Sequence, residues 1–210
     1  YRNAPSKLSI PLVLLVMDLY EVESKKNRKR FWAGGSSQRA VRDVCEQSTV
    51  IVTPSEYIKK ELLRLFTVPL NKVVVAPMGI DACFGSKQQC IVQKPYYLVV
   101  GKVSVRKNLD RLMEAFARIE DDVEHSLVIV GQPGEQEPEH WGDRVIRIDR
   151  LGTTQLAGLY EHCDMYLAAS VYEGSGITVL EAFQSGALVG AGRVGGIGEV
   201  AGDVPLYFSP

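Results

Sequence analysis

The sequence predicts an α/β protein with two parallel-sheet domains. Short apolar runs alternate with segments of helical periodicity along the 210 residues, a pattern typical of parallel strands joined by helices. Glycines and charged residues directly follow several of these runs, at the positions where such sheets bind ligands. The stretch Pro77-Met78-Gly79-Ile80-Asp81 interrupts the alternation with two breakers and indicates a hinge. We therefore expect one domain over residues 1–79 and a second over residues 80–210.

The composition is that of a globular protein. Hydrophobic residues make up 46% of the chain and charged residues 23%, which is ordinary for a soluble protein with a buried core. The longest apolar run, Ile10–Met17, includes Pro11 and is far shorter than the ~20 residues that span a bilayer. The sequence shows no signal peptide and no Cys-x-x-Cys or Cys/His metal pattern. We expect a cytoplasmic protein with reduced thiols and no bound metal. Because the chain begins with Tyr1 rather than Met, we also expect a piece of a longer protein.

The first domain is predicted from three apolar strands and two helices. Pro11–Met17 is continuously apolar, as expected of a strand that is covered on both faces. Ser55 is a good N-cap for the helix Glu56–Phe66, in which four apolar residues share one face. The other predicted elements of this domain are the helix Ser36–Glu46 and the strands Thr49–Val52 and Lys72–Val75.

The second domain repeats this alternation from Tyr97 onward. The strand Tyr97–Val100 ends at Gly101, and Asn108 is the predicted N-cap of a helix over Leu109–Ile119. The side chains of that helix predicted to face the core are Leu112, Ala115, Phe116 and Ile119. The elements that follow are the strand Leu127–Val130, a loop over Gln132–His140, the strand Val145–Ile148, the helix Thr153–His162, the strand Met165–Ala168, the helix Ile177–Gln184 and the strand Leu188–Gly190. Strands separated by helices predict a parallel sheet with right-handed crossovers.

Charge is distributed unevenly along the chain. Residues 1–80 contain 13 Lys and Arg against 7 Asp and Glu, whereas the remaining residues contain 11 against 18. The run Lys25–Trp32 carries five of the cations and ends in two aromatic residues. Such a run is typical of peripheral contact with anionic lipids at the inner face of a membrane, or of contact with a phosphorylated acceptor. A solvated loop explains it equally well. We expect no nucleic-acid partner, because the chain as a whole is not basic.

The strongest site motif is Val171-Tyr172-Glu173-Gly174-Ser175-Gly176-Ile177-Thr178-Val179-Leu180-Glu181-Ala182, which joins a predicted strand to a helix. Gly174 and Gly176 allow the backbone to approach a ligand closely, and the N–H groups at the helix start attract anions. Glu173 precedes the turn, and Glu181 lies inside the helix, where it can accept hydrogen bonds from vicinal hydroxyls such as those of a ribose. Taken alone, the motif is explained as well by a glycine-bearing turn flanked by a capping and a surface glutamate.

A second motif, Gly101-Lys102-Val103-Ser104-Val105-Arg106-Lys107-Asn108, places three cations between a strand end and a helix start. Cations at this end of a helix oppose its dipole, so they do little to stabilise the helix. They fit a site where an anion such as a diphosphate lies between them and the helix. A solvated turn is the alternative. Together the two motifs predict a site for a nucleoside-diphosphate sugar.

These motifs, followed by Val-Gly-Gly-Ile-Gly-Glu-Val at 194–200, resemble the GT-B retaining glycosyltransferases of family 4, the glycosyl transferases group 1. The segments at 55–66 and 71–81 resemble the end of that family's N-terminal domain and its linker, so the resemblance covers nearly the whole chain. It implies two Rossmann-like domains, with residues 1–79 on the acceptor side and residues 80–210 binding the donor.

The resemblance also implies roles for individual residues. Lys102 and Lys107 would bind the diphosphate of a UDP-sugar or GDP-sugar and support catalysis together with Glu173, which would contact the donor sugar. Glu181 would bind the ribose. Backbone N–H groups of Gly174, Ser175 and Gly176 would contact sugar and phosphate. The family uses no metal or other cofactor, and its reaction retains the anomeric configuration. The acceptor would be a glycan, a lipid-linked sugar or a small molecule, as in polysaccharide biosynthesis.

The sequence departs from the family pattern in three ways. Lys102 stands where the family usually has Arg, which keeps the charge but loses the bidentate fork. Met17 replaces the His that often precedes Asp18, the residue that the resemblance places on the acceptor side. The family's first βα units and its final helices have no counterpart here, so both domains are expected to be incomplete and the chain alone to be inactive.

Two alternatives to a glycosyltransferase remain open. A non-catalytic module that binds nucleotide sugars would explain Met17 and Lys102. A sugar-nucleotide epimerase or a phosphorylase of the same fold is disfavoured by the Glu-x7-Glu spacing of Glu173 and Glu181.

The remaining motifs carry less information about function. Gly195-Gly196-Ile197-Gly198 lacks the spacing of a dinucleotide-binding loop and is expected to form a turn near the donor. The three histidines, His125, His140 and His162, lie apart with no nucleophile nearby, so we expect no catalytic role for them.

Overall fold

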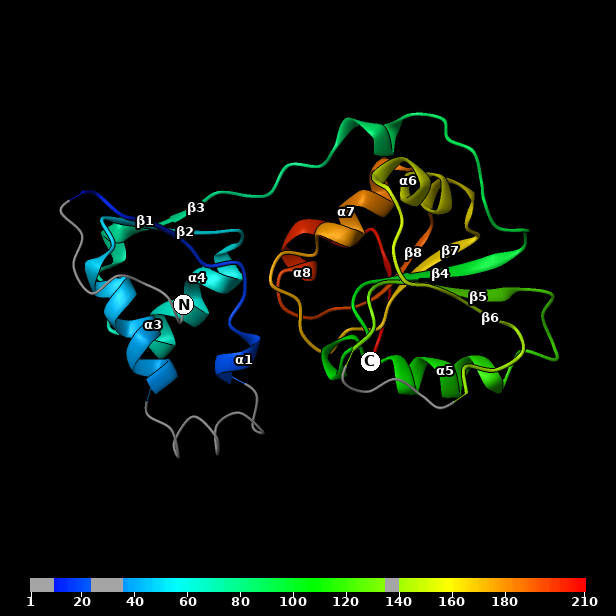
Figure 1. The fold of residues 1–210 in the computed structure, drawn as a ribbon, viewed down its shortest axis with the longest axis horizontal. Helices are drawn as coiled ribbons and strands as arrows, with labels where there is room; N and C mark the ends of the chain where they lie inside the picture. The colour runs from blue at the N-terminus through cyan, green and yellow to red at the C-terminus, as the bar shows by residue number, and fades with distance from the viewer. Residues whose placement is uncertain (1–9, 24–35, 135–139) are drawn as a thin grey trace. The chain divides into compact units, whose positions relative to one another are not determined.

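The computed structural model describes residues 10–23, 36–134 and 140–210 (Figure 1). The chain divides into two compact units, Tyr1–Met78 and Gly79–Pro210. The basic run Lys25–Trp32 and the centre of the predicted loop Gln132–His140 lie outside the described residues.

The first unit contains a three-stranded parallel sheet in the order β1-β2-β3. Its strands are β1 (Val13–Leu15), β2 (Val50–Thr53) and β3 (Val73–Val75). Its helices are α1 (Tyr20–Glu23), α3 (Ser36–Gln47), α4 (Glu56–Leu65) and the 3-10 turn η1 (Leu70–Lys72). Ser55 caps α4 as predicted, because its hydroxyl oxygen accepts a hydrogen bond of 3.1 Å from the backbone N–H of Ile58.

The prediction that β1 is covered on both faces was wrong for the described part of the chain. The strand register places Val13 and Leu15 on one face of the sheet, and these side chains are 64% and 55% exposed. Helix α4 packs on β2 and β3, and Ile51 and Val73 are buried in these strands. An apolar run alone therefore indicates a strand but does not show how many of its faces are covered.

The second unit contains a six-stranded sheet in the order β6-β5-β4-β7-β8-β9, and all of its neighbouring strands are parallel. The strands are β4 (Tyr96–Val100), β5 (Ser126–Val130), β6 (Val145–Ile148), β7 (Met165–Ala168), β8 (Val189–Gly192) and β9 (Leu206–Phe208). Counted from β4, this is the order 3-2-1-4-5-6 of a Rossmann sheet. The chain reverses its direction of travel across the sheet between β4 and β7, so these two strands flank the topological switch point.

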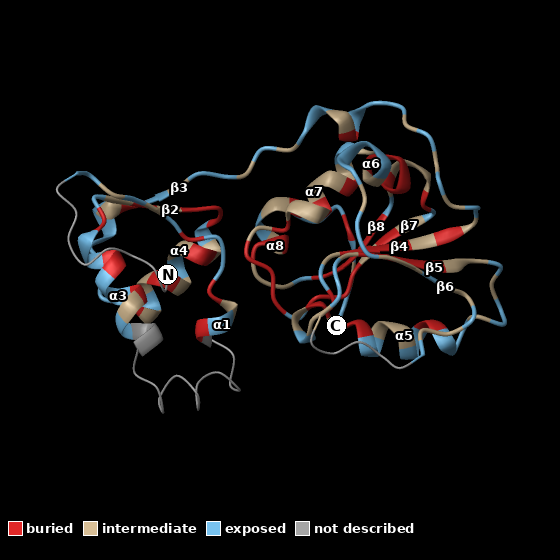
Figure 2. Ribbon diagram, in the orientation of Figure 1, coloured by how far each residue is buried: buried red, intermediate tan, exposed pale blue. Residues whose placement is uncertain are grey.

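Helices cover both faces of this sheet (Figure 1). Helix α5 (Leu109–Ala117) lies on one face, while α6 (Thr153–His162), α7 (Ile177–Gln184) and α8 (Ile197–Ala201) lie on the other. Two 3-10 turns, η2 (Ala82–Gly85) and η3 (Val105–Lys107), complete the described elements. Side chains alternate along β4, so Leu98 joins the core beneath α6 and α7 while Val99 joins the core beneath α5. Figure 2 shows that the central strands of the unit are buried.

Helix α5 differs from its prediction in two respects. It ends at Ala117, and Ala115 and Ile119 are exposed beside an apolar cavity of about 260 Å³ rather than packed in the core. Asn108 precedes the helix, but its backbone is left-handed with φ 55° and its side chain makes no capping hydrogen bond. Its Nδ2 atom is buried without a partner among the described residues. The N-cap position was therefore right and its mechanism was not.

No helix in residues 10–23, 36–134 and 140–210 is long and apolar enough to cross a membrane.

Candidate functional site

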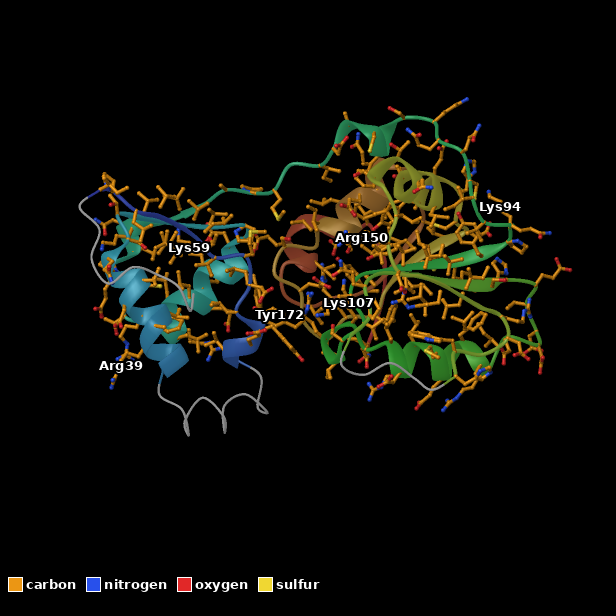
Figure 3. The ribbon with its side chains drawn as sticks, viewed as in Figure 1. Arg39, Lys59, Lys94, Lys107, Arg150 and Tyr172 are labelled. Carbon is orange, nitrogen blue, oxygen red and sulfur yellow. The ribbon has the colours of Figure 1, made fainter. Side chains whose placement is uncertain are left out.

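The candidate site lies at the carboxyl ends of β4 and β7, the two strands at the switch point. The loop after β4 contains Lys107, and the loop after β7 contains Tyr172; both residues are labelled in Figure 3. A backbone hydrogen bond of 2.9 Å from Val171 N–H to the Arg106 carbonyl joins the two loops directly. Ligands of open α/β sheets bind in the crevice at such a point.

The centre of the site is a buried ion pair between Lys107 and Glu173. Lys107 Nζ lies 2.8 Å from Glu173 Oε1, and the two side chains are 8% and 11% exposed. The Ser170 hydroxyl donates a second hydrogen bond of 2.7 Å to the same oxygen. Arg106 Nη1 lies 3.0 Å from the other oxygen, Oε2. Burial acts to raise the pKa of Glu173, but the charges of Lys107 and Arg106 and the hydrogen bonds outweigh it, so that the pKa lies below its ordinary value.

Gly101, the first residue after β4, makes room for the Lys107 side chain. Its φ of +141° is one that side-chain-bearing residues rarely adopt. A Cβ atom at this position would lie only 2.3 Å from Lys107 Cε. The glycine that ends β4 therefore allows the lysine stem to cross the strand end and reach Glu173.

The turn Gly195-Gly196 holds the backbone of Glu173 from the other side. The Gly196 N–H donates a hydrogen bond of 2.8 Å to the Glu173 carbonyl. A Cβ atom on Gly195 would lie 2.0 Å from that carbonyl oxygen, so only glycine allows this approach. The sequence predicted a turn here, and the structure places it directly against the loop that carries Glu173.

The glycines of the second motif shape the start of α7. Gly176 is the N-cap residue, with a left-handed backbone of φ 70°, and α7 begins at Ile177 as predicted. Gly174 and Gly176 are buried, and Ser175 is half-buried. The first N–H groups of a helix lack partners within it and carry a positive partial charge, so this helix start favours an anion.

Glu181 lies one turn inside α7 and is held by a buried tyrosine. Tyr160 donates a hydrogen bond of 3.1 Å to Glu181 Oε2, and Oε1 has no hydrogen-bond partner among the described residues. Burial raises the pKa of Glu181, opposed by the Tyr160 hydrogen bond and by the charge of Lys107. Tyr160 itself is fully buried and packs edge-on against Tyr166. One carboxylate oxygen is thus fixed by a hydrogen bond within the protein.

Lys102 takes no part in this cluster. Its side chain is exposed, and it forms no ion pair or hydrogen bond with any residue that the structure describes. The structure therefore brings Lys107 and Glu173 into contact, sets Glu181 within electrostatic reach of Lys107, and leaves Lys102 free in solvent. Arg106 was one of three cations in the motif, and no feature of the motif singled it out.

Asp18, predicted on the acceptor side, belongs to the first unit. Its Oδ1 accepts a hydrogen bond of 3.2 Å from the backbone N–H of Tyr20, where α1 begins. In this structure the carboxylate has a local role at the start of that helix, and its relation to an acceptor stays a prediction.

Within the described residues, no three His, Cys, Asp or Glu side chains gather as they would around a metal ion. The cysteines Cys45, Cys83, Cys90 and Cys163 are all free. His125 stacks on Tyr97, and His162 lies 3.0 Å from the Gln88 carbonyl oxygen.

A six-stranded sheet of this order, with charged loops at its switch point, defines the second unit as a doubly wound α/β domain. Residues 86–204 match the family described as glycosyl transferases group 1, and the chain belongs to this family.

Similarity to individual proteins supports this assignment. The chain is 26% identical over 193 residues to O-antigen chain mannosyltransferase B of Escherichia coli, covering 82% of this chain and 51% of that protein. It is 25% identical over 206 residues to a glycogen synthase of Mycobacterium tuberculosis, covering 89% and 48%. The chain thus spans about half the length of these relatives.

Solved structures share the fold. Anabaena HepE, in complex with UDP and glucose, superposes with a TM-score of 0.76 at 16% identity, covering 95% of this chain and 58% of that chain. WaaG, a glycosyltransferase involved in lipopolysaccharide biosynthesis, superposes with a TM-score of 0.68 at 18% identity, covering 91% and 60%. These similarities confirm the predicted α/β architecture of the GT-B type.

Proposed function

We propose that this chain is the donor-binding part, with a portion of the acceptor-binding part, of a retaining glycosyltransferase that uses a UDP-sugar or GDP-sugar. The observation that carries the proposal is the buried pair of Lys107 and Glu173 beside the start of α7, at the switch point of the sheet. Residues 80–210 hold the donor, and residues 1–79 contribute to the acceptor side. The family assignment and the UDP bound in Anabaena HepE support the same choice of ligand.

The diphosphate of the donor binds between Lys107 and the N-terminal end of α7. A lysine ammonium has three donors, of which one meets Glu173, so two remain for phosphate oxygens. The α7 dipole adds a positive partial charge on the opposite side of the anion. Exposed Lys102 turns onto the diphosphate when the donor arrives, which explains why it has no partner among the described residues.

The sugar and the ribose bind to the two glutamates. Oε1 of Glu181 accepts hydrogen bonds from the ribose hydroxyls, while Tyr160 keeps the carboxylate in place through Oε2. The Glu173 carboxylate, ionised and oriented by its cations, contacts hydroxyls of the donor sugar. Backbone N–H groups of Gly174, Ser175 and Gly176 complete the contacts.

The transfer retains the anomeric configuration through attack from the face that the diphosphate leaves. The bond between the anomeric carbon and the diphosphate oxygen breaks, and a bond from the acceptor oxygen to that carbon forms on the same side. The acceptor proton passes to an oxygen of the departing diphosphate. Lys107 stabilises the negative charge that grows on this leaving group, and the reaction needs no metal or organic cofactor.

Release of free nucleoside diphosphate by the full-length parent protein tests the proposal. A panel of UDP-sugars and GDP-sugars would be incubated with and without sugar and lipid-linked acceptors. We expect one donor to give acceptor-dependent release and an α-linked product from an α-linked donor. An inverted product would refute retention. Tight nucleotide binding without release would indicate a non-catalytic module, and conversion of the donor to an isomeric nucleotide sugar would indicate an epimerase.

The run Lys25–Trp32 is proposed to contact anionic lipids at the cytoplasmic face of a membrane, where a lipid-linked acceptor would be presented. The full-length protein is expected to co-sediment with vesicles that contain anionic phospholipid and not with neutral vesicles. Replacing the five cations of the run by Gln should abolish this difference, and unchanged sedimentation would refute the proposal.

A further inference from the structure

Arg106 is the second cation on Glu173, and it holds the oxygen that Lys107 does not. Arg106 Nη1 lies 3.0 Å from Oε2, whereas Lys107 and Ser170 both bind Oε1. Among the described residues, Arg106 is the one hydrogen-bond partner of Oε2. The plane of the carboxylate is therefore fixed by two cations, one on each oxygen.

The backbone around this pair is anchored independently of the Arg106 side chain. Val171 N–H donates to the Arg106 carbonyl at 2.9 Å, and Gly196 N–H donates to the Glu173 carbonyl at 2.8 Å. Neither hydrogen bond involves the Arg106 side chain. A substitution at Arg106 therefore changes the charge and orientation at Glu173 without removing these links between the loops.

Donor binding changes the electrostatic surroundings of Glu173. In the proposed function, the Lys107 ammonium also donates hydrogen bonds to the diphosphate. The two phosphates then bring negative charge close to the Glu173 carboxylate. Besides Lys107, the groups that face Glu173 are Arg106, the Ser170 hydroxyl and the Tyr166 phenol from β7. In the same proposal, Arg106 stays on Oε2 of Glu173 and does not bind the diphosphate.

We propose that Arg106 is a positioning residue that keeps the Glu173 carboxylate ionised and aimed at the donor sugar while Lys107 is engaged by the diphosphate. This inference rests on the proposed glycosyltransferase function and assigns different roles to two adjacent cations. Lys107 stabilises the charge on the leaving diphosphate, and Arg106 orients the Glu173 carboxylate.

The test compares Arg106→Gln and Arg106→Lys with Arg118→Gln in the full-length protein. Arg118 is the C-cap residue of α5, at the opposite end of that helix from Lys107, and it is exposed, so Arg118→Gln is a matched loss of one arginine. The first measurement is the pH dependence of kcat at saturating donor. Arg106→Gln should move the acidic limb upward by about one pH unit, because a neighbouring opposite charge shifts a carboxyl pKa by roughly that much or more. Arg106→Lys should restore most of the shift, and Arg118→Gln should leave the limb unchanged.

The second measurement follows the Glu173 carboxyl directly, by NMR of protein labelled with ¹³C in glutamate carboxyls, with the signal assigned from the Glu173→Gln spectrum. Titrations with and without UDP or GDP should show a raised Glu173 pKa in Arg106→Gln, and a larger rise with nucleotide bound. An unchanged Glu173 pKa, or lower stability with an unmoved acidic limb, would overturn the inference. If no donor is turned over, the proposed function fails, and the nucleotide-free titration still decides the role of Arg106: a raised pKa supports it and an unchanged one overturns it.

Discussion

Lys107 Nζ and Glu173 Oε1 lie 2.8 Å apart although 66 positions separate the two residues in the sequence. Each residue belongs to a loop at the carboxyl end of a strand, and these strands, β4 and β7, are neighbours in the sheet. A buried ion pair adds little to stability compared with well-packed apolar residues, because both charges lose their hydration. The proposed function accounts for its presence at the switch point, because the diphosphate and the donor sugar are proposed to bind these two charges.

Removing one partner of this pair should destabilise the protein strongly. Glu173→Gln leaves the Lys107 ammonium buried without a counter-charge, which typically costs about 3–5 kcal/mol. The pKa of Glu173 lies below its ordinary value, so its contribution is present above the unfolded pKa of about 4.3 and is lost as the pH falls through the folded pKa. Urea unfolding should therefore show the largest deficit of Glu173→Gln near pH 7 and a shrinking deficit below pH ~4.

The double variant Glu173→Gln/Lys107→Met supplies the control for this prediction. Because it removes both charges, it should recover much of the stability lost by Glu173→Gln. If the loss of stability in the double variant equals the sum of the losses in Glu173→Gln and Lys107→Met, the two residues are not coupled.

Gly101→Ala should disrupt the site more than the fold. A Cβ at Gly101 would lie 2.3 Å from Lys107 Cε, and the backbone φ of +141° is strained for alanine. We expect a loss of about 1–3 kcal/mol in unfolding free energy and a loss of donor turnover of at least tenfold, as Lys107 is pushed away from Glu173. Gly186→Ala is the matched control, because that glycine also has a positive φ, of +77°, but faces open space. Equal losses of turnover in the two variants at equal stability would contradict the proposed clearance for Lys107.

Glu181→Gln should raise the stability of the protein and lower its affinity for the donor. The pKa of Glu181 is raised by burial, so the folded state is favoured below the unfolded pKa and loses that advantage as the pH rises through the folded pKa. Glutamine cannot ionise, so Glu181→Gln should unfold at a higher temperature than the wild type at pH 7, with the gain disappearing near pH 4. Donor affinity should fall on the order of tenfold, the loss expected for a charge-assisted hydrogen bond. Scanning calorimetry measures the unfolding temperature and titration calorimetry measures donor affinity, with Glu114→Gln as an exposed control. A Glu181→Gln variant that is less stable than the wild type at pH 7 would contradict the prediction.

Much of the second unit could be predicted from its sequence. The bounds of β6, α6, β7 and α7 agree with those predicted, because each element is flanked by glycine or by polar residues. Helix α8 was missed because it is five residues long and is flanked and interrupted by glycines, which leave no period to detect. The exposure of Val13 and Leu15 could not be foreseen, since an apolar run does not report which layers cover it.

The candidate site was predictable in its residue types but not in its pairing. Charged loops after strands indicate a ligand edge, and the motif spacing identified Lys107, Glu173 and Glu181 as candidates. The strand order and the tight turn η3 determine which cations form ion pairs with Glu173. Arg106 and Lys107 both lie in this turn, and both contact the Glu173 carboxylate. The Tyr160 hydrogen bond to Glu181 links two helices and leaves no signature in either sequence segment.

Substitutions of Lys102 and of Lys107 should differ in their effect on stability. Lys102 is exposed and unpaired among the described residues, whereas Lys107 is buried against Glu173. Lys102→Ala should change the unfolding free energy by less than about 0.5 kcal/mol, as surface substitutions do, whereas Lys107→Ala should lower it markedly. Lys102→Arg should keep or raise activity, since a guanidinium binds phosphate in a bidentate manner.

In steady-state kinetics with varied donor, assayed where both variants are folded, Lys107→Ala should depress kcat more than it raises the donor KM. The physical reason is that negative charge grows on the diphosphate as the glycosidic bond breaks, so a cation beside it binds the transition state more tightly than the ground state. Lys102→Ala should show the same pattern with a smaller loss, because Lys102 reaches the diphosphate from the exposed edge of the site, where solvent and salt screen its charge. If Lys107→Ala raises the donor KM and leaves kcat untouched, Lys107 is a docking contact that binds both states equally, and its role in the departure of the leaving group must be given up.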